Sequence, residues 1–117
     1  MNEEIDKISE YLKTGWASDI GSQIQYLTDL SSFKARVNEF KVIAEGHYID
    51  KLSQFRSQSG TSKMKQFEYR DSRDIFCRDA ILFKAECDNL SGTIETQCRA
   101  LITIISHAKE EMKMLTN

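Results

Sequence analysis

The sequence predicts an all-α protein: a long antiparallel helical hairpin of the coiled-coil type, preceded by a short N-terminal helix. Three observations predict it. The 117 residues include no proline and only five glycines, which favours helix over sheet. Apolar residues recur at alternating spacings of three and four, the period of one helix face. The middle of the chain contains one clear turn signal. The length is that of one domain, residues 1–117.

The first predicted helix covers about residues 2–14. Its apolar face consists of Ile5, Ile8, Tyr11 and Leu12, and Gly15 is a typical helix stop. The only tryptophan, Trp16, follows directly. We expect its ring to fill the gap where the helix ends.

The second predicted helix covers about residues 18–56, and Ser18 or Asp19 can cap its start. Its apolar residues continue the three-and-four spacing. A small, polar segment, residues 57–62, follows and contains Gly60. This segment is the predicted turn.

The third predicted helix covers about residues 63–115 and has the most regular pattern in the chain. Only Gln97 and Glu111 interrupt its apolar stripe, and an apolar residue follows each of them. The stripe consists of Phe76, Ala80, Phe83, Cys87, Leu90, Ile94, Gln97, Leu101, Ile104, Ala108, Glu111 and Leu115.

Folding the chain at Gly60 predicts which residues of the two long helices face each other. In that register Phe76 faces Ala44, and Leu90 faces Leu30. The N-terminal helix either extends the second helix past a kink or packs beside it as a third member.

A hairpin with one apolar stripe per helix has a thin core. Apolar residues beside the stripe therefore need another surface, and we expect self-association. The stripe is widest near the C-terminal end, so the expected homo-oligomer interface consists of Leu101, Ile102, Ile105, Met112 and Leu115.

Composition and motifs argue against several classes of protein. No apolar run is long enough to span a membrane, and the acidic start is unlike a secretory signal, so a cytoplasmic protein is expected. Cys77, Cys87 and Cys98 lie at least ten residues apart on one predicted helix. That spacing is about 15 Å, too far for a disulfide. We expect small hydrophobic side chains, with Cys87 and Cys98 buried on or beside the apolar stripe, and the sequence leaves open whether Cys77 is exposed.

Catalytic and metal-binding motifs are missing from the sequence, so neither an enzyme nor a cofactor is expected. Asp71, Asp74 and Asp79 are the nearest approach to the acidic cluster of a metal-dependent helical hydrolase. Arginines alternate with them, as in surface ion pairs.

Charge is distributed unevenly along the chain. The net charge is −2, yet residues 51–73 carry six basic against two acidic side chains, a local excess of four positive charges. Aromatic residues lie among these cations, a combination that binds single-stranded nucleic acid through phosphate contacts and base stacking. The candidate nucleic-acid-binding residues are Lys51, Arg56, Lys63, Lys65, Phe67, Tyr69, Arg70 and Arg73.

The overall pattern resembles the UvsY-type recombination mediators of phages. The resemblance lies in the segment GTSKMKQFE, residues 60–68, followed by the apolar helix of residues 74–105. It implies a non-enzymatic accessory protein of phage or mobile-element recombination. Such a protein binds single-stranded DNA, forms a ring-like oligomer and helps to load a recombinase in exchange for a single-strand-binding protein. On this reading Lys63, Lys65 and Arg70 contact DNA.

A second interpretation needs no nucleic acid. A chain with such an apolar helix could be a helical protein–protein interaction module: an adaptor, a chaperone or a structural component that docks a protein partner along its apolar groove.

Overall fold

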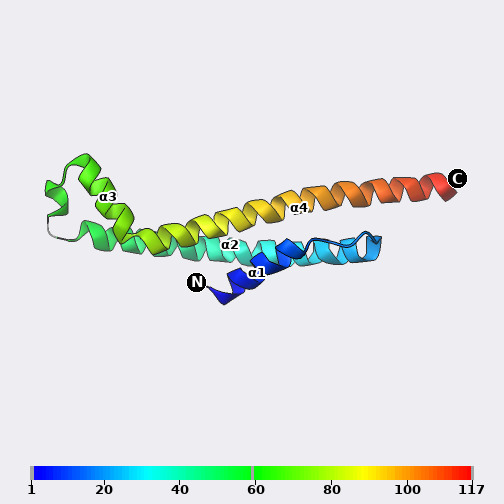
Figure 1. Ribbon diagram of the computed structural model, residues 1–117, viewed down its shortest axis with the longest axis horizontal. Helices are drawn as coiled ribbons and strands as arrows, with labels where there is room; N and C mark the ends of the chain where they lie inside the picture. The colour runs from blue at the N-terminus through cyan, green and yellow to red at the C-terminus, as the bar shows by residue number, and fades with distance from the viewer. Residues whose placement is uncertain (1, 59, 117) are drawn as a thin grey trace. The chain divides into compact units, whose positions relative to one another are not determined.

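The structure is a computed structural model that describes residues 2–58 and 60–116, and every regular element within these ranges is a helix (Figure 1). The two long helices, α2 and α4, pack against each other in antiparallel directions. The predicted all-α helical hairpin is therefore confirmed. The elements in chain order are α1 (Glu3–Thr14), α2 (Ile20–Arg56), the 3-10 helix η1 (Thr61–Lys63), α3 (Gln66–Phe76) and α4 (Arg78–Thr116).

The contacts within the chain divide it into two compact units. One unit holds the described residues up to Val37 and those from Asn89 onward, and the other holds Asn38–Asp88. Helices α2 and α4 contribute one part to each unit. We call these the terminal unit and the turn unit.

The core of the terminal unit is built from the apolar faces of three helices. Helix α4 contributes residues of the predicted stripe as far as Leu101. Beyond it the stripe prediction is wrong by one position, because Ile105 is buried and Ile104 is 38% exposed. Burying a side chain of this size contributes about 1.5–3 kcal/mol. The buried apolar residues are Ile5, Ile8, Leu12, Tyr26, Leu30, Val37, Leu90, Ile94, Leu101 and Ile105.

Helix α1 has defined ends. At its start, Oδ1 of Asn2 accepts hydrogen bonds from the backbone N–H of Glu4 and Ile5, at 2.9 and 3.3 Å. These bonds satisfy two of the donors that a helix N-terminus leaves free. At its end, Gly15 has a φ of +68°, a backbone region that favours glycine.

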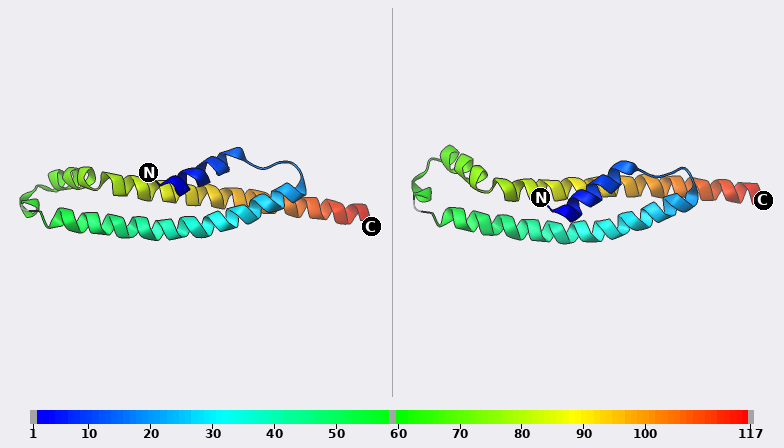
Figure 2. Two further views of the ribbon diagram at one scale, coloured as in Figure 1. Left: turned by 90° about the horizontal axis from the view of Figure 1, so that it is seen from below. Right: turned by 60° about the horizontal axis from the view of Figure 1, so that its bottom comes forward.

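Helix α1 packs beside α2 as a third helix, which decides between the two arrangements that the sequence left open (Figure 2). The ring of Tyr11 stacks on Tyr26 and meets Phe33 edge-on, with centroids 5.1 and 5.0 Å apart. The Tyr11 hydroxyl donates a hydrogen bond to Asp29. Trp16, which follows the helix, is half-buried and packs edge-on against Tyr26, with centroids 5.6 Å apart.

Gln97, which interrupts the apolar stripe of α4, joins all three helices of the terminal unit. Its Nε2 donates to the backbone carbonyl of Leu12 at 3.1 Å. Its Oε1 accepts from the hydroxyl of Tyr26 at 2.8 Å. The polar side chain therefore satisfies a carbonyl at the end of α1 and a hydroxyl on α2.

The turn unit packs the second half of α2 against α3 and the start of α4. The rings of Phe40 and Phe83 meet edge-on at 6.4 Å. Nζ of Lys84 pairs with Glu45 at 2.9 Å, and both side chains are partly exposed, so this pair adds little stability.

The expected register between Phe76 and Ala44 is wrong. Phe76 instead packs on Phe55, with centroids 5.7 Å apart, and Lys51 lies over its ring. The extended residues after η1 and the bend at Cys77 shift the second arm of the hairpin relative to the first.

The third helix also differs from its expected extent of 63–115. Residues 61–63 form η1, Met64 and Lys65 are extended, and a bend at Cys77 separates α3 from α4. The bend allows both Tyr69 and Phe76 to contact Phe55. We attribute the break to this packing, since the sequence here has no helix-breaking residue.

The three cysteines form no disulfide with one another, and the burial expected for Cys87 is confirmed. Cys77 and Cys87 are fully buried, and Cys98 is half-buried. Burial raises the pKa of the Cys87 and Cys98 thiols, which makes these thiols less reactive.

Candidate nucleic-acid interface

The turn between α2 and α3 is closed by Gly60 and Thr61. Gly60 has a φ of +91°, a left-handed conformation that glycine adopts without strain. Thr61 is buried, and its hydroxyl donates to the carbonyls of Arg56 and Gln58, at 3.3 and 3.0 Å. The start of η1 is therefore tied to the end of α2, which fixes where the following lysines emerge.

Four of the eight candidate residues point into solvent after this turn. Phe67 has 63% of its surface exposed, and Lys63, Lys65 and Arg70 are also exposed. Among the described residues, no carboxylate forms an ion pair with any of these three cations. We call Lys63, Lys65, Phe67 and Arg70 the turn surface.

Two of the other four candidates have structural contacts with aromatic rings. Nζ of Lys51 lies 5.6 Å from the centroid of the Phe76 ring, a cation–π contact. Tyr69 is half-buried, and its ring lies 5.2 Å from that of Phe55. Tyr69 therefore helps to hold α3 on α2, and its ring is less open to a base than that of Phe67.

The remaining two candidates, Arg56 and Arg73, also have partners within the turn unit. Nε of the exposed Arg56 donates to the hydroxyl of Tyr69 at 3.3 Å. Nη2 of the half-buried Arg73 pairs with Oδ1 of Asp74 at 3.3 Å. Of the two, only Arg56 has its guanidinium in an exposed side chain near the turn.

Two carboxylates lie on the exposed face of α3. Asp71 and Asp74 follow Phe67 by four and seven residues, positions that share one face of a helix. Both side chains are exposed. The exposed cations of the turn surface are therefore Lys63, Lys65 and Arg70, and the exposed Glu68 lies between the last two in the sequence.

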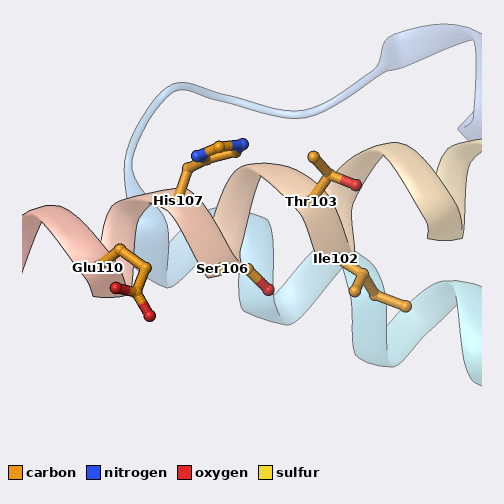
Figure 3. Close-up of a pocket in the computed structure, with 5 residues that line it drawn as sticks. All are labelled: Ile102, Thr103, Ser106, His107 and Glu110. Carbon is orange, nitrogen blue, oxygen red and sulfur yellow. The ribbon is translucent and has the colours of Figure 1, made fainter.

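The candidate oligomer interface on α4 also contains both buried and exposed residues. Leu101 and Ile105 are buried in the terminal unit, whereas Ile102, Met112 and Leu115 are 53%, 59% and 87% exposed. Ile102 lines a shallow hollow on the outer side of α4 together with Thr103, Ser106, His107 and Glu110 (Figure 3).

Sequence reasoning identified the basic segment but did not separate its exposed and packed members. The sequence analysis did not anticipate the bend at Cys77. Because of this bend, α3 is a separate helix with its own inward face packed towards α2. Within α3 the half-buried residues are Tyr69, Ser72, Arg73 and Phe76. Their three- and four-residue spacing marks that inward face and could have identified it.

Comparison of the chain with protein-family models, with curated proteins and with solved structures finds no match. Within residues 2–58 and 60–116, no helix combines the length and apolarity needed to cross a bilayer. The same residues contain no group of three or more His, Cys, Asp or Glu side chains arranged to hold a metal ion.

Proposed function

We propose that this protein is a non-enzymatic accessory protein that binds single-stranded DNA through the turn surface. The observation that supports this proposal best is the exposed ring of Phe67 among three exposed cations. A large apolar ring in solvent has no role in the core of the turn unit. It is the kind of group on which an unpaired base stacks.

The cations and the aromatic ring would bind different parts of the nucleic acid. Lys63, Lys65 and Arg70 attract the phosphate backbone without regard to sequence. An aromatic face stacks on any base, contributing about 1–3 kcal/mol per base, but only where the base is not stacked in a duplex. The combination favours single strands over double strands.

The biological setting follows from the resemblance of the sequence to UvsY-type mediators. In this proposal the protein acts in the cytoplasm during phage or mobile-element recombination, as a homo-oligomer that assists recombinase loading. Its protein partners are a recombinase or a single-strand-binding protein.

Charge reversal on the turn surface tests the proposal. We expect the protein to bind a labelled oligo-dT of about thirty nucleotides, measured by fluorescence anisotropy. With three cations at phosphates, the logarithm of affinity should fall with the logarithm of salt with a slope of about −2. The double variant Lys63→Glu/Lys65→Glu should weaken binding by at least about tenfold at low salt.

The matched control is Lys7→Glu/Lys109→Glu, which makes the same change in net charge at two exposed lysines of the terminal unit. This control should bind more tightly than the turn variant. Equal affinities of the two variants would mean that DNA binding reflects total charge. The turn surface would then not be the DNA-binding site.

A second candidate function, the protein-interaction module, is favoured by the exposed apolar residues of α4. Ile102 and Leu115 are large side chains in solvent near the chain's C-terminal end, where a partner helix or a second copy could cover them. Ile105 is buried, so a charge there would disrupt the fold. Ile102→Glu is the suitable variant, with Ile75→Glu on α3 as its exposed control.

Sedimentation equilibrium gives the readout for this second candidate. If α4 carries a self-association surface, Ile102→Glu should shift the protein towards the monomer and Ile75→Glu should not. If the wild-type protein is monomeric at micromolar concentration, the expected self-association is wrong.

A further inference from the structure

The exposed face of α3 changes sign along its length. At about 100° per residue, Asp71 and Asp74 lie within about 40° of Phe67 around the helix axis. Both are exposed, so their charges act on whatever approaches this face. Lys63 and Lys65 precede α3, and Arg70 is the exposed cation of α3 beside Phe67. Asp71 and Asp74 follow Arg70 on this face, whereas the exposed Glu68 lies about 100° from Phe67 around the axis.

The ion pair between Arg73 and Asp74 leaves the negative charge of Asp71 and Asp74 exposed to solvent. Asp74 is bonded to Arg73, but the Arg73 side chain is the less exposed of the two, at 31% against 53%. No described cation forms an ion pair with Asp71. A phosphate that passed beyond Arg70 along α3 would therefore meet two exposed carboxylates.

We propose that Asp71 and Asp74 end the nucleic-acid footprint of each chain. In this inference, which rests on the proposed function, one chain takes a short stretch of single strand. One base stacks on Phe67, its neighbouring phosphates lie at Lys63, Lys65 and Arg70, and the strand then leaves α3. The two aspartates are specificity-determining residues that limit the length of strand held.

The repulsion follows from simple electrostatics. Unit charges about 10 Å apart in water interact weakly, and salt at 0.1 M screens much of that interaction. The effect of the carboxylates should therefore be modest and confined to low salt. A short footprint with few contacts also means that tight binding to long strands requires several chains on one strand.

The double variant Asp71→Asn/Asp74→Asn tests the inference, with oligo-dT of about thirty nucleotides as the probe. At low salt its affinity should rise about two- to fivefold over the wild type. The number of nucleotides occluded per chain, from titration of a longer oligo-dT at saturating protein, should increase. Only the second readout separates a longer footprint from general attraction.

The matched control is Glu110→Gln/Glu111→Gln, which neutralises two exposed carboxylates at the far end of α4. This control should leave the occluded length unchanged. An occluded length that is the same in the wild type and in Asp71→Asn/Asp74→Asn would overturn the inference.

Phe67→Ala separates the failure of the inference from failure of the proposed function. If Phe67→Ala weakens binding but the aspartate variant leaves the occluded length unchanged, the turn surface binds DNA and the footprint is not limited by Asp71 and Asp74. If the wild type does not bind oligo-dT at low salt, both the proposed function and this inference are wrong.

Discussion

Single polar residues explain how α1 is held in the terminal unit. Tyr11 packs against two aromatic rings and donates its hydroxyl proton to Asp29. Burial, reinforced by the bond to Asp29 and by the charge of that carboxylate, raises the pKa of Tyr11 to about 12. The neutral hydroxyl is therefore the form that the folded state favours.

Removing that hydroxyl should have a measurable and pH-dependent cost. We expect Tyr11→Phe to lower the free energy of unfolding by about 1 kcal/mol near pH 7, the typical contribution of one hydrogen bond. Urea titrations of the wild type and the variant measure this difference. The control is Tyr48→Phe, on α2 in the turn unit, which should cost less.

The sign of the pH dependence follows from the raised pKa. The folded protein holds the Tyr11 proton more tightly than the unfolded chain, whose tyrosine titrates near 10. The advantage over Tyr11→Phe should be constant below pH 10 and decline as the pH rises towards 12. A difference that grew across this range would contradict the assigned hydrogen bond.

At the scale of elements, α4 shows where an apolar stripe is covered and where it is not. Its buried face extends as far as Ile105, whereas Ile104 and Leu115 of the predicted stripe are 38% and 87% exposed. Helix α2 begins only at Ile20, and α1 meets α4 where Leu12 bonds to Gln97. Leu115, near the end of α4, therefore has most of its side chain in solvent.

Two leucine truncations on this one helix should have very different costs. Leu101→Ala removes a fully buried side chain and should lower the free energy of unfolding by about 2–5 kcal/mol. Leu115→Ala changes a side chain in solvent and should cost less than about 0.5 kcal/mol at low protein concentration. Thermal or urea unfolding of both variants measures the contrast, and equal costs would contradict the described packing of α4.

Periodicity predicted the two arms of the hairpin, because each long helix buries one face, but it did not predict the division of the second arm into η1, α3 and α4. Gln97 could be read as an interruption but not as a contact, since its partners come from α1 and α2. The bend at Cys77 could not be predicted, because packing on Phe55 causes it and no proline or glycine marks it.

Contacts between distant parts of the chain also limited what could be predicted of the candidate site. Lys63, Lys65 and Arg70 could be selected by charge, but selecting Phe67 over Tyr69 required the position of Phe55. That position depends on the register of the hairpin. The register in turn depends on how many residues the turn uses, and a pattern of apolar residues alone does not specify that number.

At the scale of the whole molecule, the net charge of −2 conceals a positive segment at residues 51–73. The rest of the chain carries the balancing negative charge, which should repel DNA and restrict contact to the turn surface. A few cations and one exposed ring per chain give modest affinity for DNA. We therefore expect several chains to bind one strand together.

The central claim is that the wild-type protein binds single-stranded DNA electrostatically and as an oligomer. The most direct test is fluorescence anisotropy with labelled oligo-dT of about thirty nucleotides at low and at moderate salt, with light scattering on the same sample. We expect micromolar or tighter binding that weakens with salt, by a protein heavier than one chain. An absence of binding at low salt, where electrostatic attraction is strongest, would contradict it and leave the protein-interaction module as the better explanation.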